Sequence, residues 1–521
     1  MNNNTTNFLS RRSFLNLSAA SAVAASAALV GCGKQQPAID VVAPTNGTIS
    51  ILASYASDNF NPLSTTSALA VGCNWHVVEG LYGMDYHDYT VHPELADGDP
   101  IQLDETTYEI TLRKNAKFSD GNLVTAKDIC ASFERACTNN VYASMLAPIE
   151  SIEPHSDTTV MVKTAYPFSL VRERLAILRV VPASATDEDL TRKPMGSGPW
   201  KYEHINEQEV VCVPNNHYNG THKALATELV WTIVCDDEER LAAALEGDAY
   251  IMENVPSDAL NDVKNAGMSV DTLEGFGLSF MLFNTKKAPF DNVAVRQACL
   301  YALNMDRIIA NAMSGSVTAA TSFLPKKHPS YHEAATVYSY DLAKAQQLLE
   351  ENEVVPGTVR LNVVTSSYMD EAAALIAEDL QALGFTVELG LASSVDTYAA
   401  LDADPNAFDI VVAPGDPSCF GNDPDLLMNW YYGQNTWTIT RTQWADAPEC
   451  LELEDKMQQA VQMTGDEQQA LWNECFDIIA NNVPLYPLFH RQVSTAYFED
   501  KVDNFAGIAT TGVLTLGTSL V

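Results

Sequence analysis

The segment APGDPSCFGNDPD, residues 413–425, combines three aspartates with proline and glycine directly after an apolar run. The run stays apolar up to Val412, which predicts a strand that delivers Asp416, Asp423 and Asp425 at its end. Ligands of open α/β sheets bind at that end of the strands, and a carboxylate there suits an ammonium group by charge and by hydrogen bonding. The alternative is that these aspartates cap turns and the following helix, as aspartate commonly does.

Motifs for catalysis are absent from the sequence. It contains no G-x-S-x-G, no Walker A pattern, no H-E-x-x-H and no S-x-x-K with its companion motifs, so we predict no catalytic residues, no cofactor and no enzymatic activity. The stretch MDYHDYTVHPE, residues 84–94, gathers His87, Asp88, His92 and Glu94. Its spacing matches no defined metal site, so a solvated loop is favoured over a metal centre.

The N-terminal segment has the layout of an export signal, with a basic start, an apolar middle and small residues at its end. Arg11 and Arg12 precede an apolar run over residues 15–30, which is shorter than the roughly 20 residues of a spanning helix. SRRSFL resembles the twin-arginine signal, and LVGC, ending at Cys32, resembles the bacterial lipoprotein box. We predict that residues 1–31 are removed and that Cys32 is lipidated, which anchors the chain without spanning the membrane. The alternative is a buried N-terminal helix.

Length, charge and cysteine spacing restrict the class of protein. A chain of 521 residues exceeds one simple core, which predicts two or three domains. The formal charge of -37 opposes binding to nucleic acid, because phosphate backbones would be repelled. The nine cysteines besides Cys32 are scattered and contain no C-x-x-C, so no disulfide framework is predicted. Cys130, Cys137 and Cys299 lie in helix-like apolar patterns and are expected to be buried free thiols.

Strand patterns dominate the first half of the chain. A helix over residues 124–137 is predicted to begin at Thr125, with Asp128 three residues later completing a capping box. Alternating apolar and polar residues predict four strands and one two-stranded hairpin. These segments are residues 48–56, 106–113, 158–165 and 229–234 for the strands and 196–218 for the hairpin.

The second half alternates helix and strand, as in a parallel α/β layer. Asp291, Asp306 and Asp341 are placed to cap its helices. Together the two halves predict an α/β protein with at least two lobes, one of them richer in antiparallel strands. The alternating segments are residues 340–352 and 369–384 for helices and 359–367 and 408–416 for strands.

Six segments, in this order, make nearly the whole mature chain resemble the extracytoplasmic solute-binding proteins of ABC importers. The family concerned, family 5, binds oligopeptides, dipeptides and, in some members, nickel. Each segment alone is weak, whereas their order is specific to the family. The segments are NPLSTTSALAVGCNWHVVEGLY, TYEITLRKNAKFSDGNLVTAKDICASFERA, GSGPWKY with VPNNHYNG, LSFMLFNTKKAPFDNVAVRQACLYALNMDRII, YDLAKAQQLLEE and VPLYPLFH.

The resemblance implies a periplasmic-binding-protein-like fold of the class II, cluster C type. In this fold two lobes, joined by crossing strands, close on a solute by hinge motion. By the same resemblance, lobe I is expected to consist of a core and an extra subdomain. The expected ranges are 45–85, 186–280 and 486–521 for the core of lobe I, 86–185 for the extra subdomain and 281–485 for lobe II.

The resemblance also implies a site residue, because an aspartate near a strand end of the second lobe pairs with the α-ammonium of the peptide. Asp416 is the best match to this aspartate, and Asp423 is the fallback. Peptide-binding members usually carry an aromatic residue two or three positions earlier, where this chain has Ala413 and Pro414. The sequence indicates no partner for the carboxylate of the peptide.

Aromatic side chains supply the other candidates for contact with the ligand. Tyr55, Trp75 and Trp430 are predicted to line the cleft, and Tyr431 and Trp437 are further candidates. The alternative for each is a position in the core or at the rim.

The predicted function is a lipid-anchored, monomeric receptor that captures peptides outside the cell membrane, in the periplasm or at the cell surface. It would deliver them to the permease and ATPase subunits of an ABC importer. Within the same class the ligand could instead be a nickel or other metal chelate, haem or a glycoside. A metal would place a histidine in the cleft, whereas a peptide requires an aspartate. A sensory or adhesion lipoprotein and, from another class, an exported hydrolase are the remaining alternatives.

Overall fold

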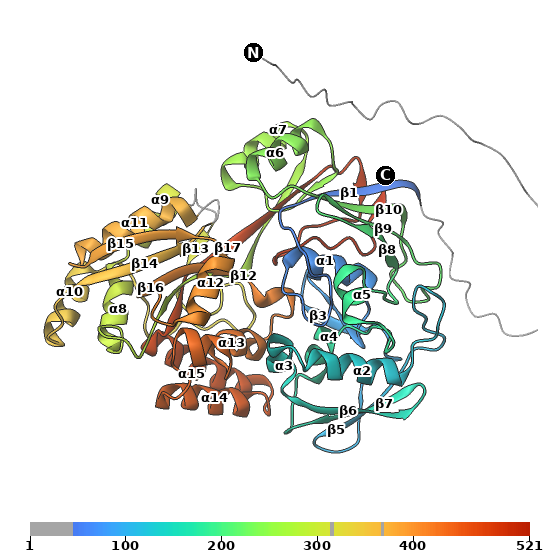
Figure 1. Cartoon of the computed structure of the whole chain (residues 1–521), viewed down its shortest axis with the longest axis horizontal. Helices are drawn as coiled ribbons and strands as arrows, with labels where there is room; N and C mark the ends of the chain where they lie inside the picture. The colour runs from blue at the N-terminus through green and yellow to red at the C-terminus, as the bar shows by residue number, and fades with distance from the viewer. Residues whose placement is uncertain (1–44, 313–316, 366–368) are drawn as a thin grey trace, which may run out of the picture. The chain divides into compact units, whose positions relative to one another are not determined.

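The computed structural model describes residues 45–312, 317–365 and 369–521 (Figure 1). The predicted signal peptide, residues 1–31, and the predicted lipidation site Cys32 lie outside the described residues. Within the described part of the chain, no helix is both long enough and apolar enough to cross a bilayer.

One mixed sheet of eleven strands organises the described residues (Figure 1). Its order is β15 (Thr386–Ala392), β14 (Thr358–Val364), β16 (Ile410–Gly415), β12 (Ser269–Phe283), β17 (Leu485–Tyr497), β11 (Ile251–Met252), β1 (Thr45–Ala53), β10 (Ala226–Ile233), β9 (Glu209–Pro214) and β8 (Trp200–Ile205), with β13 (Val317–Ala319) beside β17. The β14 strand pairs in parallel with β15 and β16, and β1 pairs in parallel with β10 and β11. The sheet therefore has two partly parallel flanks.

The long strands β12 and β17 connect the two flanks. They pair antiparallel from Ser269 opposite Tyr497 to Leu282 opposite Leu485. At one end β17 pairs with β11, and at the other end β12 pairs with β16. Because β12 and β17 join the two flanks into one sheet, the lobe boundaries expected from the sequence stay a prediction.

Helices cover both flanks of the sheet, and α11 packs directly on β14 and β15. The α-helices of the described residues are α1 (Ala68–Val77), α2 (Ala126–Ala136), α3 (Asn140–Leu146), α4 (Val171–Ile177), α5 (Asp187–Arg192), α6 (Asp237–Glu246), α7 (Leu260–Asn265), α8 (Val293–Ala302), α9 (Met305–Ala312), α10 (Leu342–Glu351), α11 (Met369–Ala382), α12 (Ser394–Ala403), α13 (Pro424–Tyr432), α14 (Pro448–Ala460) and α15 (Gly465–Asn482). Three short helical turns of other types are η1 (Ser257–Ala259), η2 (Pro417–Cys419) and η3 (Trp437–Arg441).

Three smaller sheets accompany the large one. Helix α2 packs on β6 and β7 of a four-stranded sheet. Its order is β4 (Ile101–Gln102), β5 (Thr107–Thr111), β7 (Thr159–Thr164) and β6 (Ile149–Ser156). The two-stranded sheets are β2 (Tyr82–Asp85) with β3 (Thr90–Pro93), and β18 (Val502–Asp503) with β19 (Ser519–Leu520).

Most of the predicted elements are present. The four predicted strands correspond to β1, β5, β7 and β10, and the predicted hairpin corresponds to β8 and β9. Thr125 and Asp128 form the expected capping box at the start of α2. Asp341 caps α10 by accepting a hydrogen bond from the amide of Lys344 at 2.9 Å. These predictions are confirmed.

Two predicted helix caps and one predicted thiol environment are wrong. Asn292, not Asp291, caps α8 by accepting from the amide of Ala294. Asp306 lies inside the first turn of α9, whose amides are bound by the preceding Asn304. Among the described cysteines, which are all free, Cys137 is exposed rather than buried. It follows the last residue of α2, where the apolar face of the helix has already ended.

Candidate ligand-binding site

Asp416, predicted as a ligand contact, lies where β16 meets the C-terminal segment. It begins η2, and its Oδ1 accepts a hydrogen bond from the amide of Ser418 at 3.1 Å. Its Oδ2 accepts from Thr510 Oγ1 at 3.2 Å and from the amide and hydroxyl of Thr511 at 3.2 and 3.0 Å. All these donors are neutral, and no cation of the described residues pairs with Asp416. The carboxylate therefore lacks a counter-ion at a contact between the two flanks.

Two carboxylates, one buried and one half-buried, fix the C-terminal segment from Gly507 to Gly512 beside Asp416. Glu253 is 5% exposed and accepts hydrogen bonds from the amides of Ser54 and Gly512, both at 3.0 Å. Burial is the main cause that raises the pKa of Glu253 above its usual range. Asp271 of β12 accepts a hydrogen bond from the amide of Gly507 through its Oδ2 at 2.8 Å. Both ends of the segment are thus bound to the sheet.

Asp423, the second predicted aspartate, is already paired with a cation. Arg174 of α4 is 1% exposed and donates to both oxygens of Asp423 at 2.8 and 2.9 Å, and to Asp425 at 2.5 Å. Burial alone would lower the pKa of Arg174, but the two carboxylates raise it above its usual range. Asp423 also caps α13 by accepting from the amide of Leu426. Arg174 thus compensates the charge of Asp423. Asp416, which has no such partner, is therefore the stronger candidate for an incoming ammonium group.

Two of the predicted aromatic residues approach the segment that follows Asp416. Trp75 of α1 is buried and stacks on Tyr86 with ring centres 4.0 Å apart, and the hydroxyl of Tyr86 donates to the carbonyl of Cys419 at 2.8 Å. Trp430 of α13 is half-buried and stacks on Phe420 at 5.7 Å. Both tryptophans therefore lie close to η2 and define one neighbourhood with it.

The other aromatic candidates divide between this neighbourhood and the core. Tyr55 is half-buried and directly follows Ser54, whose amide is bound to Glu253. Tyr431 and Trp437 pack around Phe280 of β12, with ring centres 5.5 and 5.6 Å from it, and so belong to the core.

A cavity of about 500 Å³, here called the cleft cavity, lies next to this neighbourhood. Its size falls within the range of small-molecule sites, about 300–1,000 Å³. Tyr89, Glu173 and Glu274 line it from the residues before 281, and His328 and Asp423 line it from residues 281–485. The cavity is therefore built by both regions that the sequence assigns to separate lobes.

The cleft cavity contains two buried polar atoms without a hydrogen bond of acceptable geometry, the hydroxyl of Tyr89 and one carboxylate oxygen of Glu274. Tyr89 lies in the turn between β2 and β3 with φ of 59°, a left-handed conformation that is uncommon for an aromatic residue. Burial first, and then the nearby charge of Asp416, raise the pKa of the Tyr89 phenol. Tyr89 thus connects the cavity with Asp416.

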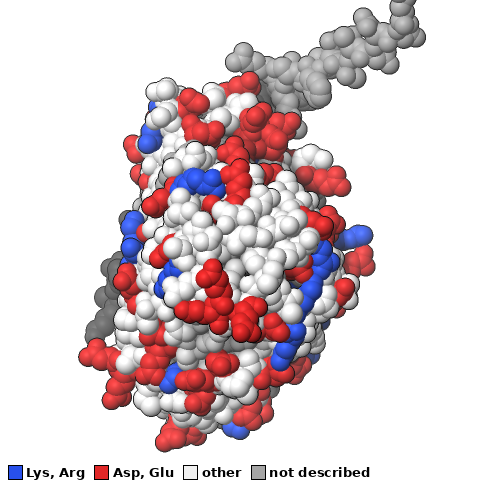
Figure 2. Space-filling view, turned by 90° about the vertical axis from the view of Figure 1, so that its left-hand side faces the viewer, with Lys and Arg blue, Asp and Glu red and all other residues white. Residues whose placement is uncertain are grey.

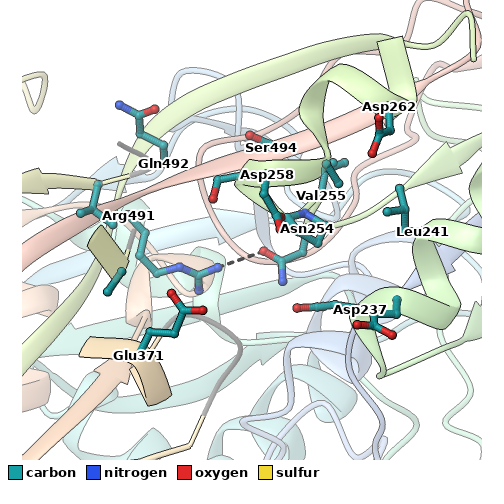
Figure 3. Close-up of a pocket in the computed structure, with 16 residues that line it drawn as sticks. Asp237, Leu241, Asn254, Val255, Asp258, Asp262, Glu371, Arg491, Gln492 and Ser494 are labelled. Carbon is teal, nitrogen blue, oxygen red and sulfur yellow. Dashed lines mark hydrogen bonds between the residues drawn. The ribbon is translucent and has the colours of Figure 1, made fainter. Parts of the chain in front are cut away.

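A second cavity of about 390 Å³, here called the Arg491 cavity, lies on the other face of the crossing strands (Figure 3). Ser494, which lines this cavity, shares a hydrogen bond with Thr272 of β12. The neighbouring residue of β12, Asp271, binds the C-terminal segment instead, so the cavity and that segment lie on opposite faces. Arg491 donates to Asn254 Oδ1 at 3.0 Å within it (Figure 3). In the part of the chain that the structure describes, no residue lining this cavity has a buried side-chain nitrogen or oxygen without a hydrogen bond. The carboxylates around it include Asp237, Asp258, Asp262 and Glu371.

The histidine-rich turn shows no metal arrangement. His87 pairs with Asp85 at 2.7 Å, and the ring of His92 lies against that of His222. Across the described residues, no group of three or more potential ligands is placed to hold a metal ion.

The surface is acidic, in keeping with the composition. Figure 2 shows carboxylate side chains spread over the face on which α10 and α11 lie, with basic side chains only scattered among them. The formal charge of the whole chain is -37. Such a field favours the approach of cationic solutes over anionic ones.

Several residues of the site were not predicted from the sequence. Thr510 and Thr511 lie 94 and 95 positions from Asp416, and nothing in their local pattern indicates the contact. Glu274 lies in a glycine-rich stretch that does not read as a strand. Tyr89 had a signal, since it belongs to the stretch singled out for its histidines. Of those two histidines His87 also lines the cavity, whereas His92 does not.

Comparison with known proteins identifies the class. Residues 90–438 match the family described as bacterial extracellular solute-binding proteins, family 5. This match covers more than half of the chain, and the chain therefore belongs to that family.

The relatives agree with this assignment. Glutathione-binding protein GsiB of Salmonella paratyphi A is 28% identical over 360 residues, which is 66% of this chain and 66% of the relative, so the match spans just under two thirds of its length. Two solved structures share the fold. AppA of Bacillus subtilis, an oligopeptide-binding protein in complex with a nonapeptide, has a TM-score of 0.78 and 18% identity over 92% of this chain and 99% of its own. NikA of Staphylococcus aureus, in complex with Ni(L-His)2, has a TM-score of 0.77 and 17% identity over 91% and 100%. These likenesses confirm the predicted mixed α/β fold.

Proposed function

We propose that this chain is the substrate-binding protein of an ABC importer and that it captures peptides between two lobes. It hands them to the permease and ATPase subunits of the transporter and performs no chemistry itself. Membership of the solute-binding family supports the class. The observation that carries the peptide assignment is Asp416, a carboxylate held by neutral donors, without a counter-ion, beside a cavity that both halves of the chain line. A peptide α-ammonium supplies the missing charge and up to three hydrogen bonds.

In this proposal the aromatic residues near η2 contribute apolar contact. Trp75 and Trp430 lie near the segment beyond Asp416, and Asp423 stays paired with Arg174. Tyr55 follows Ser54, whose amide binds Glu253. Main-chain hydrogen bonds would hold an extended peptide, and roomy pockets would accept its side chains.

Replacing Asp416 with asparagine tests the proposal. The amide keeps the shape of the side chain but not its charge, so peptide affinity should fall by about 2 kcal/mol or more, equal to about thirtyfold. Calorimetric titration of the full chain with a free and an N-acetylated tripeptide measures the effect. Acetylation should weaken binding to the unmodified protein and change little in Asp416→Asn. Asp446→Asn, on an exposed aspartate paired with Lys286, serves as the matched control.

Equal affinity of the two peptides for the unmodified protein would refute the role of Asp416. Native mass spectrometry of the protein purified gently from cells distinguishes the other ligand classes. A spread of bound masses supports peptides. A single mass that fits a metal chelate, haem or a glycoside would replace the peptide assignment and leave the receptor class intact.

We further propose that the mature chain begins at a lipidated Cys32 and is held at the outside of the cell membrane. The order of twin arginines, apolar run and LVGC supports this. In cells, Cys32→Ala is expected to lose incorporation of labelled fatty acid and to move from the membrane fraction to the soluble fraction. Retention of the label in that variant would contradict the proposal.

A further inference from the structure

Glu274 lies at a bulge in the crossing strands. It is the last residue of β12 to pair regularly with β17, opposite Gln492, and regular pairing resumes only at Leu278, opposite His490. Three residues of β12 therefore oppose the single residue Arg491 of β17. Bulges of this kind change the direction of neighbouring side chains and are frequent beside functional sites. Here the bulge accompanies a glutamate that lines the cleft cavity.

One oxygen of the Glu274 carboxylate, Oε1, is buried and lacks a hydrogen-bond donor among the described residues. A buried acceptor without a donor costs free energy, and a charged one costs more, so native proteins rarely leave such an atom unpaired without a reason. The unpaired atom is at the wall of a cavity that is large enough for a small solute.

The positive groups near the cavity do not offset this charge. Arg174 is shared between Asp423 and Asp425. His328 accepts from the amide of Ser330 at Nδ1 and contacts the carbonyl of Asn422 through Nε2, which fits a neutral ring, and burial lowers its pKa.

Two further basic residues near the bulge, His490 and Lys327, do not compensate the charge of Glu274 either. His490 is buried beside the bulge, and burial lowers its pKa to about 4. Lys327 is exposed, so water screens its charge.

Other carboxylates add to the negative potential of the cavity. Glu173 is half-buried in its wall; burial first, and then the charge of Asp423, raise the pKa of Glu173. Asp88 lies exposed at its rim, so water screens its charge as it screens that of Lys327. The negative potential inside the cavity therefore comes mainly from the half-buried Glu173 and Glu274.

We propose that the cleft cavity is a subsite for a cationic group of the solute, an ammonium or guanidinium, with Glu274 as the residue that selects for it. The proposal rests on the proposed function in that the cation is taken to be a basic side chain of a captured peptide. Glu274 is distinct from Asp416, which is assigned to the α-ammonium. An ordered water at Glu274 would satisfy one hydrogen bond but would not compensate the charge.

Titration of the full chain with two tripeptides and one small diamine tests the proposal. The probes are Ala-Lys-Ala, its neutral counterpart Ala-Met-Ala, and 1,4-diaminobutane. The unmodified protein should bind Ala-Lys-Ala about tenfold more tightly than Ala-Met-Ala, a ratio worth about 1.4 kcal/mol. In Glu274→Gln this ratio should fall to about one. Glu228→Gln, on an exposed residue of β10, is the control and should keep the full ratio.

The Tm of the ligand-free Glu274→Gln variant is a second measurement, because it distinguishes a ligand-selecting glutamate from one with a purely structural role. Glu274→Gln removes an uncompensated charge, so the Tm of the ligand-free protein should rise. A glutamate that only held the fold together would give a lower Tm.

The outcomes separate the two proposals. Equal binding of both tripeptides, or a ratio that survives in Glu274→Gln, overturns the cationic subsite and leaves peptide capture standing. Binding of the diamine alone, dependent on Glu274, supports the subsite and overturns peptide capture. Absence of binding by all three probes overturns both.

Discussion

Replacing Arg174 with methionine is expected to lower the free energy of unfolding by about 3–5 kcal/mol. Arg174 is 1% exposed and binds both Asp423 and Asp425, so the substitution leaves two carboxylates buried together without their cation. The remaining charges are desolvated and repel each other, which is why breaking a buried ion pair costs far more than breaking a surface pair. Methionine keeps much of the apolar volume, so cavity formation contributes little. Urea unfolding followed by tryptophan fluorescence measures the loss.

Two further variants test whether charge is the cause. Arg192→Met breaks an exposed pair with Glu188, whose side chains are 78% and 73% exposed, and should cost less than about 1 kcal/mol. Adding Asp423→Asn and Asp425→Asn to Arg174→Met should recover most of the loss, because the amides carry no charge. No recovery, or a loss below 1 kcal/mol in Arg174→Met itself, would show that the ion cluster does not stabilise the fold in solution.

The same contacts bear on capture and release of the solute. Arg174 reaches α13 from α4, and Thr511 reaches Asp416 from the C-terminal segment. Each contact crosses a predicted lobe boundary, so the proposed opening of the cleft by a hinge would break both. In the proposed function, a solute that carries an ammonium group would compensate Asp416 when the lobes close again. On that proposal, the charges at the boundary link closure to the chemistry of the solute.

Local rules predicted those parts of the fold whose determinants are local. The capping box of Thr125 and Asp128 depends on residues three positions apart, and the structure has it. Asp291 and Asp306 failed as caps because Asn292, one position after Asp291, and Asn304, two positions before Asp306, bind the helix amides instead. Strand β12 was not among the strands predicted from the sequence. Its strand conformation depends on pairing with β17, where contacting residues such as Phe276 and His490 are 214 positions apart.

For the candidate site too, only the locally determined features could be predicted from the sequence. The apolar run up to Val412 predicted that Asp416 follows a strand, and it directly follows β16; its role as a ligand contact stays a prediction. The local pattern could not distinguish Asp416 from Asp423, because the difference between them is the distant Arg174. Glu274 carried no sequence signal, since its significance comes from burial at a bulge and from a missing partner. Tertiary contacts decide both points.

Gly275→Ala is expected to destabilise the protein by about 3 kcal/mol and to abolish peptide binding. A Cβ atom on Gly275 would lie 1.7 Å from the carbonyl oxygen of Ala509, which is backbone and cannot rotate away. The C-terminal segment cannot withdraw cheaply either, because Asp271 and Glu253 bind it on both sides of the clash. Displacing it would also remove the Thr511 hydrogen bonds that orient Asp416. Thermal unfolding and peptide titration of the same preparation measure the two effects.

Two other glycines separate this steric effect from the general effect of adding a methyl group. Gly357→Ala meets no atom within 4 Å and should leave the protein as stable or slightly more stable, because alanine restricts the unfolded chain. Gly277→Ala would place its methyl 3.3 Å from the Asp416 carboxylate, a side chain that can shift, so binding should weaken more than stability. If Gly275→Ala unfolds at the same temperature as Gly357→Ala, the C-terminal segment does not pack on β12 in solution. The neutral donors assigned to Asp416 would then have to come from elsewhere, and the charge argument for that residue would fall with them.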